Sequence, residues 1–183
     1  KAEPDSRPVS EDLRRMLMEL AALTDKLTVE WTPPSDGPER PCVRVLRADG
    51  TDTGIAFHGV PGGHEFNSFI VGLYNAAGPG QSIDPALAEA IAAIDRPLDL
   101  QIVVALSCTM CPELVIAAQK IAASNPLVTA KVYDVNHFPE LRERYKIMSV
   151  PCLIINKAKV AFGKKTLGQL LELLAEPEAG QTG

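Results

Sequence analysis

Apolar residues in the first part of the chain recur at spacings typical of helices and of strands. After Ser10, a suitable helix N-cap, Leu13, Leu17 and Leu20 recur three to four positions apart, which predicts a helix over residues 10 to about 23. "KLTVEW" alternates apolar and polar residues as a strand does, and the proline-rich loop "TPPSDGPERP" follows it. "CVRVLRADG" and "GIAFHG" predict two strands joined by an Asp-Gly turn, followed by a helix over residues 64 to 75.

The second part of the chain contains the same mixture of elements. A linker, "GPGQSIDP", leads to an alanine-rich helix over residues 86 to 94, and "LDLQIVVAL" predicts a buried strand. The next helix has an apolar face formed by Leu114, Ala117, Ala118, Ile121 and Ala122. "LVTAKVYDV" predicts another strand, and residues 139 to 147 a short charged helix. "PCLIIN" and "VAF" predict two last strands before a helix with an apolar stripe of Leu167, Leu170, Leu171 and Leu174.

Two segments of the chain are alike. Pro41-Cys42 and Pro151-Cys152 each open the order strand, turn, strand, Phe-His-Gly or Phe-Gly, helix, and each follows a strand. We therefore expect an α/β protein built from two copies of one unit: a first unit (residues 1–80) and a second unit (residues 81–176), with residues 177–183 as a tail or linker. The first unit is the reduced copy. It is expected to lack the helix before its proline, its opening strand, and any cysteine before its first helix.

Composition and charge restrict the class of protein. The chain has 183 residues, of which 46% are hydrophobic, so it can fill a substantial core. A net charge of −5 argues against binding to nucleic acid or to an anionic membrane surface. No apolar run approaches the roughly 20 residues of a membrane span, and the first residues do not resemble a signal peptide. Four cysteines are too few for a secreted disulfide scaffold, so we expect a soluble cytoplasmic protein.

The strongest chemical motif is Cys108-x-x-Cys111, which stands between a predicted strand and a predicted helix. The unpaired N–H groups and the positive dipole end of a helix N-terminus stabilise a thiolate, which favours Cys108 as a nucleophile. The spacing brings both sulfurs to one side of the first turn, where they can bond, and Pro112 is tolerated there. Downstream, Val150-Pro151 fits the cis-proline loop beside the cysteines of thioredoxin-like folds. A cis bond would expose the Val150 backbone to a partner chain.

The alternatives to a redox dithiol are a zinc site and an inert structural disulfide. Zinc would need two more ligands, and only His64, His137 or Cys152 could be recruited, because the chain has no second Cys-x-x-Cys. An inert disulfide would close a very small loop and is unusual in a cytosolic chain. Thiol–disulfide exchange is therefore the favoured interpretation, and no metal site is expected.

Three further residues receive a structural interpretation. Cys42 and Cys152 each follow a proline at the start of a strand, where a small buried thiol in the core is the simplest role. His58 is expected on the surface of its strand hairpin.

The quoted residues resemble a known family. "GIAFHGVPGGHEFNSFIVGL", "SCTMCPELV" and "MSVPCLIIN" are similar to the N-terminal domain of the alkyl hydroperoxide reductase flavoprotein subunit, or of a closely related thioredoxin-reductase-like flavoprotein. The resemblance extends from about residue 10 to residue 175. It implies two fused thioredoxin-like folds in one body, of which the first is degenerate and only the second carries an active Cys-x-x-Cys.

The resemblance also implies roles for individual residues. Cys108 matches the attacking cysteine, Cys111 the resolving cysteine, and Pro151 the proline beside them. Glu65 matches an acidic residue of the first fold that lies by the dithiol and can transfer a proton. Taken by itself, Glu65 would instead be a solvated charge in the first turn of a helix.

The family role is to take electrons from a flavoprotein reductase module and pass them to the disulfide of a peroxiredoxin. FAD and NAD(P)H are expected only in a missing or separate reductase module, because the glycines of "GVPGGHEF" are not followed by the βαβ pattern of a dinucleotide site. We therefore expect no cofactor in this chain beyond a redox-active Cys108–Cys111 disulfide.

Two other functions stay open from the sequence. A free-standing glutaredoxin-like protein disulfide oxidoreductase would act on many proteins, although two-fold enzymes of that kind usually keep a dithiol in both folds. A non-enzymatic interaction module would use the Cys-x-x-Cys for zinc or for regulation.

Overall fold

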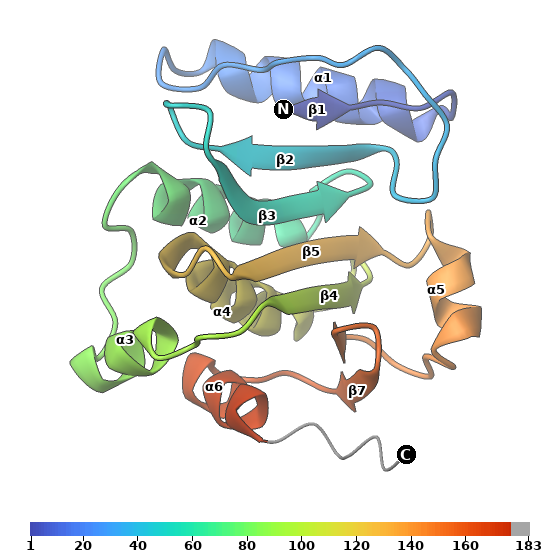
Figure 1. The fold of residues 1–183 in the computed structure, drawn as a ribbon. Helices are drawn as coiled ribbons and strands as arrows, with labels where there is room; N and C mark the ends of the chain where they lie inside the picture. The colour runs from blue at the N-terminus through green and yellow to red at the C-terminus, as the bar shows by residue number, and fades with distance from the viewer. Residues whose placement is uncertain (177–183) are drawn as a thin grey trace.

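The structure is a computed structural model that describes residues 1–176. The predicted tail, residues 177–183, lies outside the described residues. One seven-stranded sheet runs through the molecule in the order β1-β2-β3-β5-β4-β6-β7 (Figure 1). Its strands are β1 (Ala2–Glu3), β2 (Cys42–Leu46), β3 (Asp52–His58), β4 (Leu98–Val104), β5 (Val128–Asp134), β6 (Cys152–Ile155) and β7 (Lys159–Phe162). The helices are α1 (Val9–Ala22), α2 (Glu65–Ala77), α3 (Pro85–Ala92), α4 (Cys111–Ser124), α5 (Pro139–Arg144) and α6 (Leu167–Ala175).

The two halves of this sheet repeat one pairing pattern. β1 pairs antiparallel with β2, and β2 with β3; in the second half β4 pairs antiparallel with β6, and β6 with β7. The halves join where β3 runs parallel to β5, from Ile55 opposite Ala130 to His58 opposite Tyr133. The predicted α/β class and the repeat are confirmed. The division at residue 80 stays a proposal, supported by its position in the connection between α2 and α3 (Figure 1).

The first unit is more complete than the sequence indicated. Its opening strand, expected to be missing, is β1, in which Ala2 pairs with Val43. The prediction of a strand at "KLTVEW" is wrong, since only Trp31 forms an isolated bridge, parallel to Ala2. No helix occurs between Trp31 and Pro41, as expected. The prolines of the loop that joins these two residues lack N–H donors and have a fixed φ, so they disfavour a helix interior.

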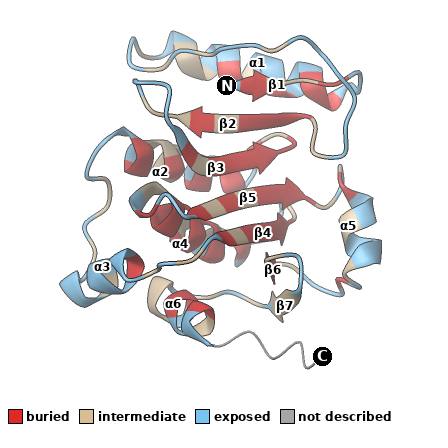
Figure 2. Ribbon diagram, viewed as in Figure 1, coloured by how far each residue is buried: buried red, intermediate tan, exposed pale blue. Residues whose placement is uncertain are grey.

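Most helices cover one face of the sheet. The main core on this face joins side chains from α1, α2, α4 and α6 to alternate residues of the strands, and its fully buried members include Leu13, Ile55, Phe57, Phe69, Ile102, Leu114, Val132 and Leu170. α5 covers part of the other face, where Leu141 and Tyr145 pack against Val103, Cys152 and Ile154. Figure 2 shows the central strands largely buried and most of α3 and α5 exposed.

Helices α2 and α4 pack side by side and run parallel (Figure 1). A Cβ on Gly72 would lie 2.6 Å from Gln119 Oε1, so the side chain of Gln119 rests against the backbone of α2. Nearer the C-terminal ends, the Arg47 guanidinium donates to the carbonyl oxygens of Ala76 at 2.7 Å and Ala123 at 2.8 Å. In both places, Gly72 with Gln119 and Ala76 with Ala123, the residue of α4 follows its partner in α2 by the same number of positions, so the two helices keep one register along their length. The N-terminal ends of the two helices therefore also lie together.

Candidate redox site

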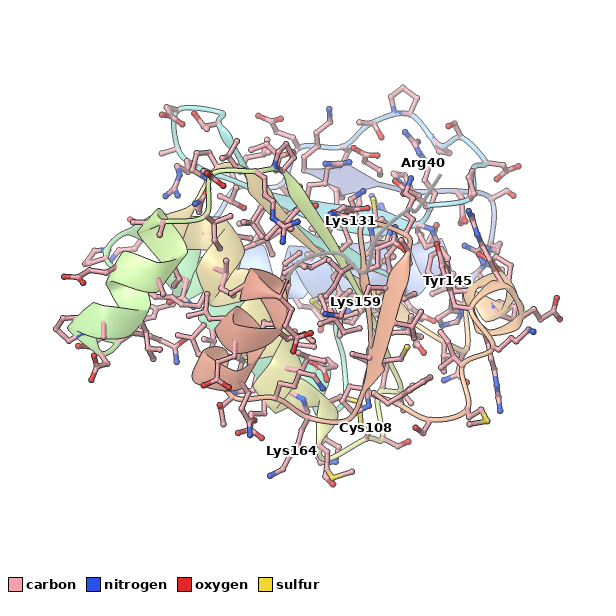
Figure 3. The ribbon with its side chains drawn as sticks, turned by 60° about the horizontal axis from the view of Figure 1, so that its bottom comes forward. Arg40, Cys108, Lys131, Tyr145, Lys159 and Lys164 are labelled. Carbon is pink, nitrogen blue, oxygen red and sulfur yellow. A yellow bond between two sulfur atoms is a disulfide. The ribbon has the colours of Figure 1, made fainter. Side chains whose placement is uncertain are left out.

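The site is built around a disulfide between Cys108 and Cys111, whose Cα atoms are 5.6 Å apart. Cys111 is the first residue of α4 and is 0% exposed, whereas Cys108 lies in the turn before the helix and is partly exposed. Figure 3 shows Cys108 at the same end of the molecule as Lys164. The predicted bond between the two sulfurs and the greater exposure of Cys108 are confirmed. Any partner must therefore meet Cys108 first.

A proline loop lies against this disulfide. The Val150-Pro151 bond is cis, as predicted, and so is the corresponding Arg40-Pro41 bond. The Val150 carbonyl oxygen is 3.9 Å from Cys108 Sγ, and the Gly163 N–H donates to the Pro151 carbonyl oxygen at 3.0 Å. The backbone of residue 150 thus borders the exposed sulfur.

The turn before α2 approaches the disulfide from the first unit. The His64 N–H donates to the carbonyl oxygen of Leu106 at 3.0 Å, two residues before Cys108. Gly63 has φ +53°, and a Cβ on it would overlap the same carbonyl oxygen. A glycine is required here both for the left-handed backbone and for the close approach. Glu65, the first residue of α2, is therefore held beside the segment that carries the dithiol.

Glu65 is a buried carboxyl group without a hydrogen-bond partner. Its side chain is 0% exposed, and neither oxygen has a partner among residues 1–176. Burial raises the pKa of Glu65 to about 7; the nearby Ser68 hydroxyl acts in the opposite direction, although it forms no hydrogen bond to either oxygen. A carboxyl group with this pKa can both accept and release a proton near neutral pH. The interpretation of Glu65 as a solvated charge is wrong.

Comparison with known proteins agrees with this architecture. The thioredoxin domain family matches residues 98–175. The crystal structure of the NTD_N/C domain of the alkyl hydroperoxide reductase AhpF from Enterococcus faecalis superimposes with a TM-score of 0.89 at 37% identity, covering 95% of this chain and 88% of that one. The chain belongs to the AhpF N-terminal domain family. The fold is thus two fused thioredoxin-like folds.

Curated relatives of this family are longer than the chain. The AhpF protein of Pseudomonas aeruginosa is 32% identical over 179 residues, which are 98% of this chain and 33% of that protein. A protein named NADH dehydrogenase from Ferdinandcohnia aciditolerans is 30% identical over 186 residues, 99% of this chain and 34% of that protein. The chain therefore spans about a third of the length of these relatives.

The remaining thiols of this family member lie outside the site. Cys42 and Cys152 are both free and buried, and burial raises the pKa of Cys42 to about 12 and that of Cys152 to about 11. A thiol that stays protonated and buried does not attack disulfides at neutral pH. Their predicted role as core thiols is confirmed.

His58 is not a surface residue, so that expectation is wrong. Its ring is 1% exposed and stacks on Tyr133 with centroids 4.0 Å apart, while Phe138 meets it edge-on. Its Nδ1 lies 2.5 Å from the Glu39 carbonyl oxygen, and burial lowers the pKa of His58 to about 4. The pairing of β3 with β5, which are distant in the sequence, brings His58 and Tyr133 together. The sequence showed only that His58 alternates with Phe57 and so points to the opposite face of the strand.

Cofactor and metal sites can be assessed from the same residues. No group of three or more His, Cys, Asp or Glu side chains placed to hold a metal ion occurs in residues 1–176. The glycine-rich turn before α2 does not fit a dinucleotide pyrophosphate, because it packs against Leu106. The His64 N–H, which would have to bind the pyrophosphate, donates to the Leu106 carbonyl oxygen instead. Within the same residues, each helix is too short or too polar to cross a membrane.

Proposed function

We propose that the chain is a thiol–disulfide electron carrier that passes two electrons from a flavoprotein reductase module to the disulfide of a peroxiredoxin. The observation that carries this proposal is a bonded pair in which Cys108 is partly exposed and Cys111 is buried at the first position of α4. Thioredoxin-like folds of this kind are disulfide oxidoreductases, and the names of the relatives indicate hydroperoxide reduction and NADH. FAD and NAD(P)H belong to the reductase module, in the same chain or a separate one.

The reaction runs through a mixed disulfide. In the reduced protein, the Cys108 thiolate attacks one sulfur of the partner's disulfide, that S–S bond breaks, and the partner's other sulfur leaves as a thiolate. Cys111 then loses its proton and attacks Cys108 Sγ, which releases the partner's second sulfur. The products are the Cys108–Cys111 disulfide and a partner dithiol, so two electrons have moved. Reduction by the flavoprotein module reverses these steps on this chain.

Glu65 is proposed as the base for the resolving step. Cys111 is 0% exposed and cannot give its proton directly to bulk water. The parallel packing of α2 and α4 brings the carboxyl-bearing end of α2 to the cysteine-bearing end of α4. Because its pKa is about 7, Glu65 is partly ionised at neutral pH and can take the Cys111 proton.

The surface around Cys108 suits a partner that presents apolar residues beside its disulfide. Three large apolar side chains are exposed on the three segments that border the site: Met110 at 52%, Met148 at 85% and Phe66 at 41%. Methionine side chains adapt to partners of varied shape, and exposed aromatic residues contribute strongly to interfaces. Pro151 is proposed to hold the loop of Met148 and Val150 in place for this contact.

Rapid-mixing kinetics with two oxidised substrates tests the proposal. The reduced chain should transfer electrons to an oxidised peroxiredoxin much faster than to insulin, and Cys108→Ser should abolish both reactions. Equal rates would instead favour a general glutaredoxin-like oxidoreductase. Reaction with neither substrate, together with zinc in the purified reduced protein, would favour the interaction module.

A second set of variants tests Glu65. Glu65→Gln should slow closure of the Cys108–Cys111 disulfide at neutral pH by roughly 100-fold, at the low end for loss of a general base, and should remove the dependence of the rate on pH near 7. Glu113→Gln is the matched control, because Glu113 also lies in the first turn of its helix but pairs with Lys164 at 3.5 Å on the surface. If the closure rate of folded Glu65→Gln depended on pH as the wild type's does, Glu65 would only be a charge that complements the N-terminus of its own helix.

A further inference from the structure

The interface between α2 and α4 contains more unpaired polar atoms than Glu65 alone. Ser68 lies one helical turn after Glu65, and Gln119 of α4 rests against Gly72, a further turn along α2. All three polar side chains are 0% exposed. Both oxygens of Glu65, the Ser68 hydroxyl and both amide atoms of Gln119 have no hydrogen-bond partner among residues 1–176.

These atoms follow one line along the interface. Residues three, four and seven positions apart share one face of a helix, so Glu65, Ser68 and Gly72 all point the same way from α2. Gly72 has no side chain, and the Gln119 amide occupies the space that a side chain there would fill. The polar line therefore runs from the dithiol end of the interface toward its middle.

Unpaired buried polar atoms need an explanation. In folded proteins such atoms are almost always satisfied, and where no protein group is available ordered water supplies the partner. Three adjacent side chains without protein partners offer a water molecule the two to four contacts that it needs. In an interface of the same shape that held no water, apolar side chains would cost less free energy to bury than polar side chains without hydrogen bonds.

Glu65 also needs a route for its proton. Glu65 takes a proton from Cys111 when the disulfide closes and can return it when the disulfide is reduced again, but exchanging that proton with the solvent between these steps needs a path to water. Its side chain is 0% exposed, so bulk water does not reach it directly.

We propose that Ser68 and Gln119 are positioning residues that hold water between α2 and α4, and that this water exchanges the proton of Glu65. The proposal rests on the proposed function of Glu65 as a base. The proton passes from Cys111 Sγ to a Glu65 oxygen and then to water held by the Ser68 hydroxyl and the Gln119 amide. No electrons move in this step, and the thiolate left on Cys111 attacks Cys108.

No charged group accounts for the behaviour of Glu65. Burial is the main cause of its raised pKa, and the only opposing influence is the Ser68 hydroxyl. On α4, Glu113 pairs with Lys164, and the Lys120 ammonium donates to the Pro79 carbonyl oxygen at 3.2 Å. The other titratable side chains that the neighbouring segments bring toward this end of the interface are His64, Cys108 and Cys111.

The test is a pH titration of the Glu65 carboxyl group, observed by carbon NMR in the oxidised chain without any partner. Wild type should titrate near pH 7. Gln119→Leu and Ser68→Ala should each raise the midpoint, the former by about one pH unit, because losing the water removes solvation from the carboxylate. Ile121→Val is the control, since Ile121 is a 0% exposed apolar residue of the same helix. It should change stability slightly and leave the midpoint in place.

Two further measurements keep the outcomes distinct. Long-lived water should transfer magnetisation to the side-chain protons of Ser68 and Gln119 in the wild type, which needs no variant to fold. Closure of a Cys108 mixed disulfide should slow at least several-fold in Gln119→Leu. Unmoved midpoints in folded variants, or no water contact in the wild type, would overturn the proposal. Shifted midpoints with unchanged closure kinetics would keep the water site and remove the role of Glu65 as the base.

Discussion

Gly63→Ala should loosen the contact between the first unit and the dithiol loop. Gly63 has φ +53°, and its Cα faces the Leu106 carbonyl oxygen so closely that a Cβ would overlap that oxygen. The obstacle is backbone, which cannot rotate away as a side chain would. Either the turn before α2 or the segment before Cys108 must move.

The size of the effect follows from two contributions. A left-handed backbone costs a residue with a Cβ about 1–2 kcal/mol relative to glycine. Moving the turn away from Leu106 also weakens the 3.0 Å hydrogen bond from the His64 N–H, worth about 1 kcal/mol. We therefore expect Gly63→Ala to lower the free energy of unfolding by about 2–3 kcal/mol.

Gly62→Ala is the matched control in the same turn. Its φ lies outside the left-handed region, and a Cβ on Gly62 would meet Leu106 Cδ1 at 3.8 Å and the Val60 carbonyl oxygen at 3.9 Å, both ordinary contacts. Alanine at a compatible glycine position changes stability by less than about 1 kcal/mol, usually upward, because it restricts the unfolded chain.

Urea unfolding of both oxidised variants measures the difference, and disulfide closure in the reduced proteins measures its consequence at the site. Gly63→Ala should close its Cys108 mixed disulfide more slowly than Gly62→Ala near pH 7, because Glu65 moves with the turn. Equal unfolding free energies for the two variants would show that the turn does not rest on Leu106, and the placement of Glu65 argued from that contact would fail with it.

Further predictions concern pH and thiol reactivity. The raised pKa of Glu65 contributes stability that is complete below pH 4.5 and is lost as pH rises to about 7, so Glu65→Gln should gain about 3 kcal/mol relative to wild type across that window in urea unfolding. The lowered pKa of His58 contributes stability that is complete above pH 6.5 and is lost as pH falls to about 4, so His58→Phe should gain about 3 kcal/mol relative to wild type on acidification. A flat difference between variant and wild type would contradict either statement. In the reduced protein iodoacetamide should modify Cys108 first, and Cys42 and Cys152 only on unfolding; mass spectrometry showing early modification of a core cysteine would contradict their burial.

The repeat of the fold could be predicted because its signals are local. Pro41 and Pro151 stand at the same place in each unit, and period-two apolar patterns mark the strands that follow them. β1 could not be predicted in this way, because two residues have no period. They form a strand only because Val43 and Cys42 offer backbone partners. "KLTVEW" shows the converse, since a strand-like pattern without a neighbour to pair with leaves a single bridge at Trp31.

His58 and Glu65 show why a local pattern fails for the residues of greatest chemical interest. Next to Phe57, a residue that alternates away from the core is ordinarily solvated, and what buries His58 is Tyr133 and Phe138 from the other unit. At the start of a helix, a glutamate is ordinarily solvated too, and there it complements the helix dipole.

Segments of the other unit also lie next to Glu65. The Leu106 carbonyl oxygen accepts from the His64 N–H, one residue before Glu65, and α4 packs along α2. The local pattern shows neither contact, so the role expected of Glu65 came only from the resemblance to a family whose motif "GHEF" has that role. A carboxyl group whose pKa is raised to about 7 costs folding stability at neutral pH, which a purely structural unit would avoid by placing an apolar residue there. Neither burial nor the unpaired polar line behind Glu65 is therefore explained by stability. With Glu65 as the proposed base, the first unit, which has no dithiol of its own, is the part that brings a proton-transferring group to the dithiol of the second.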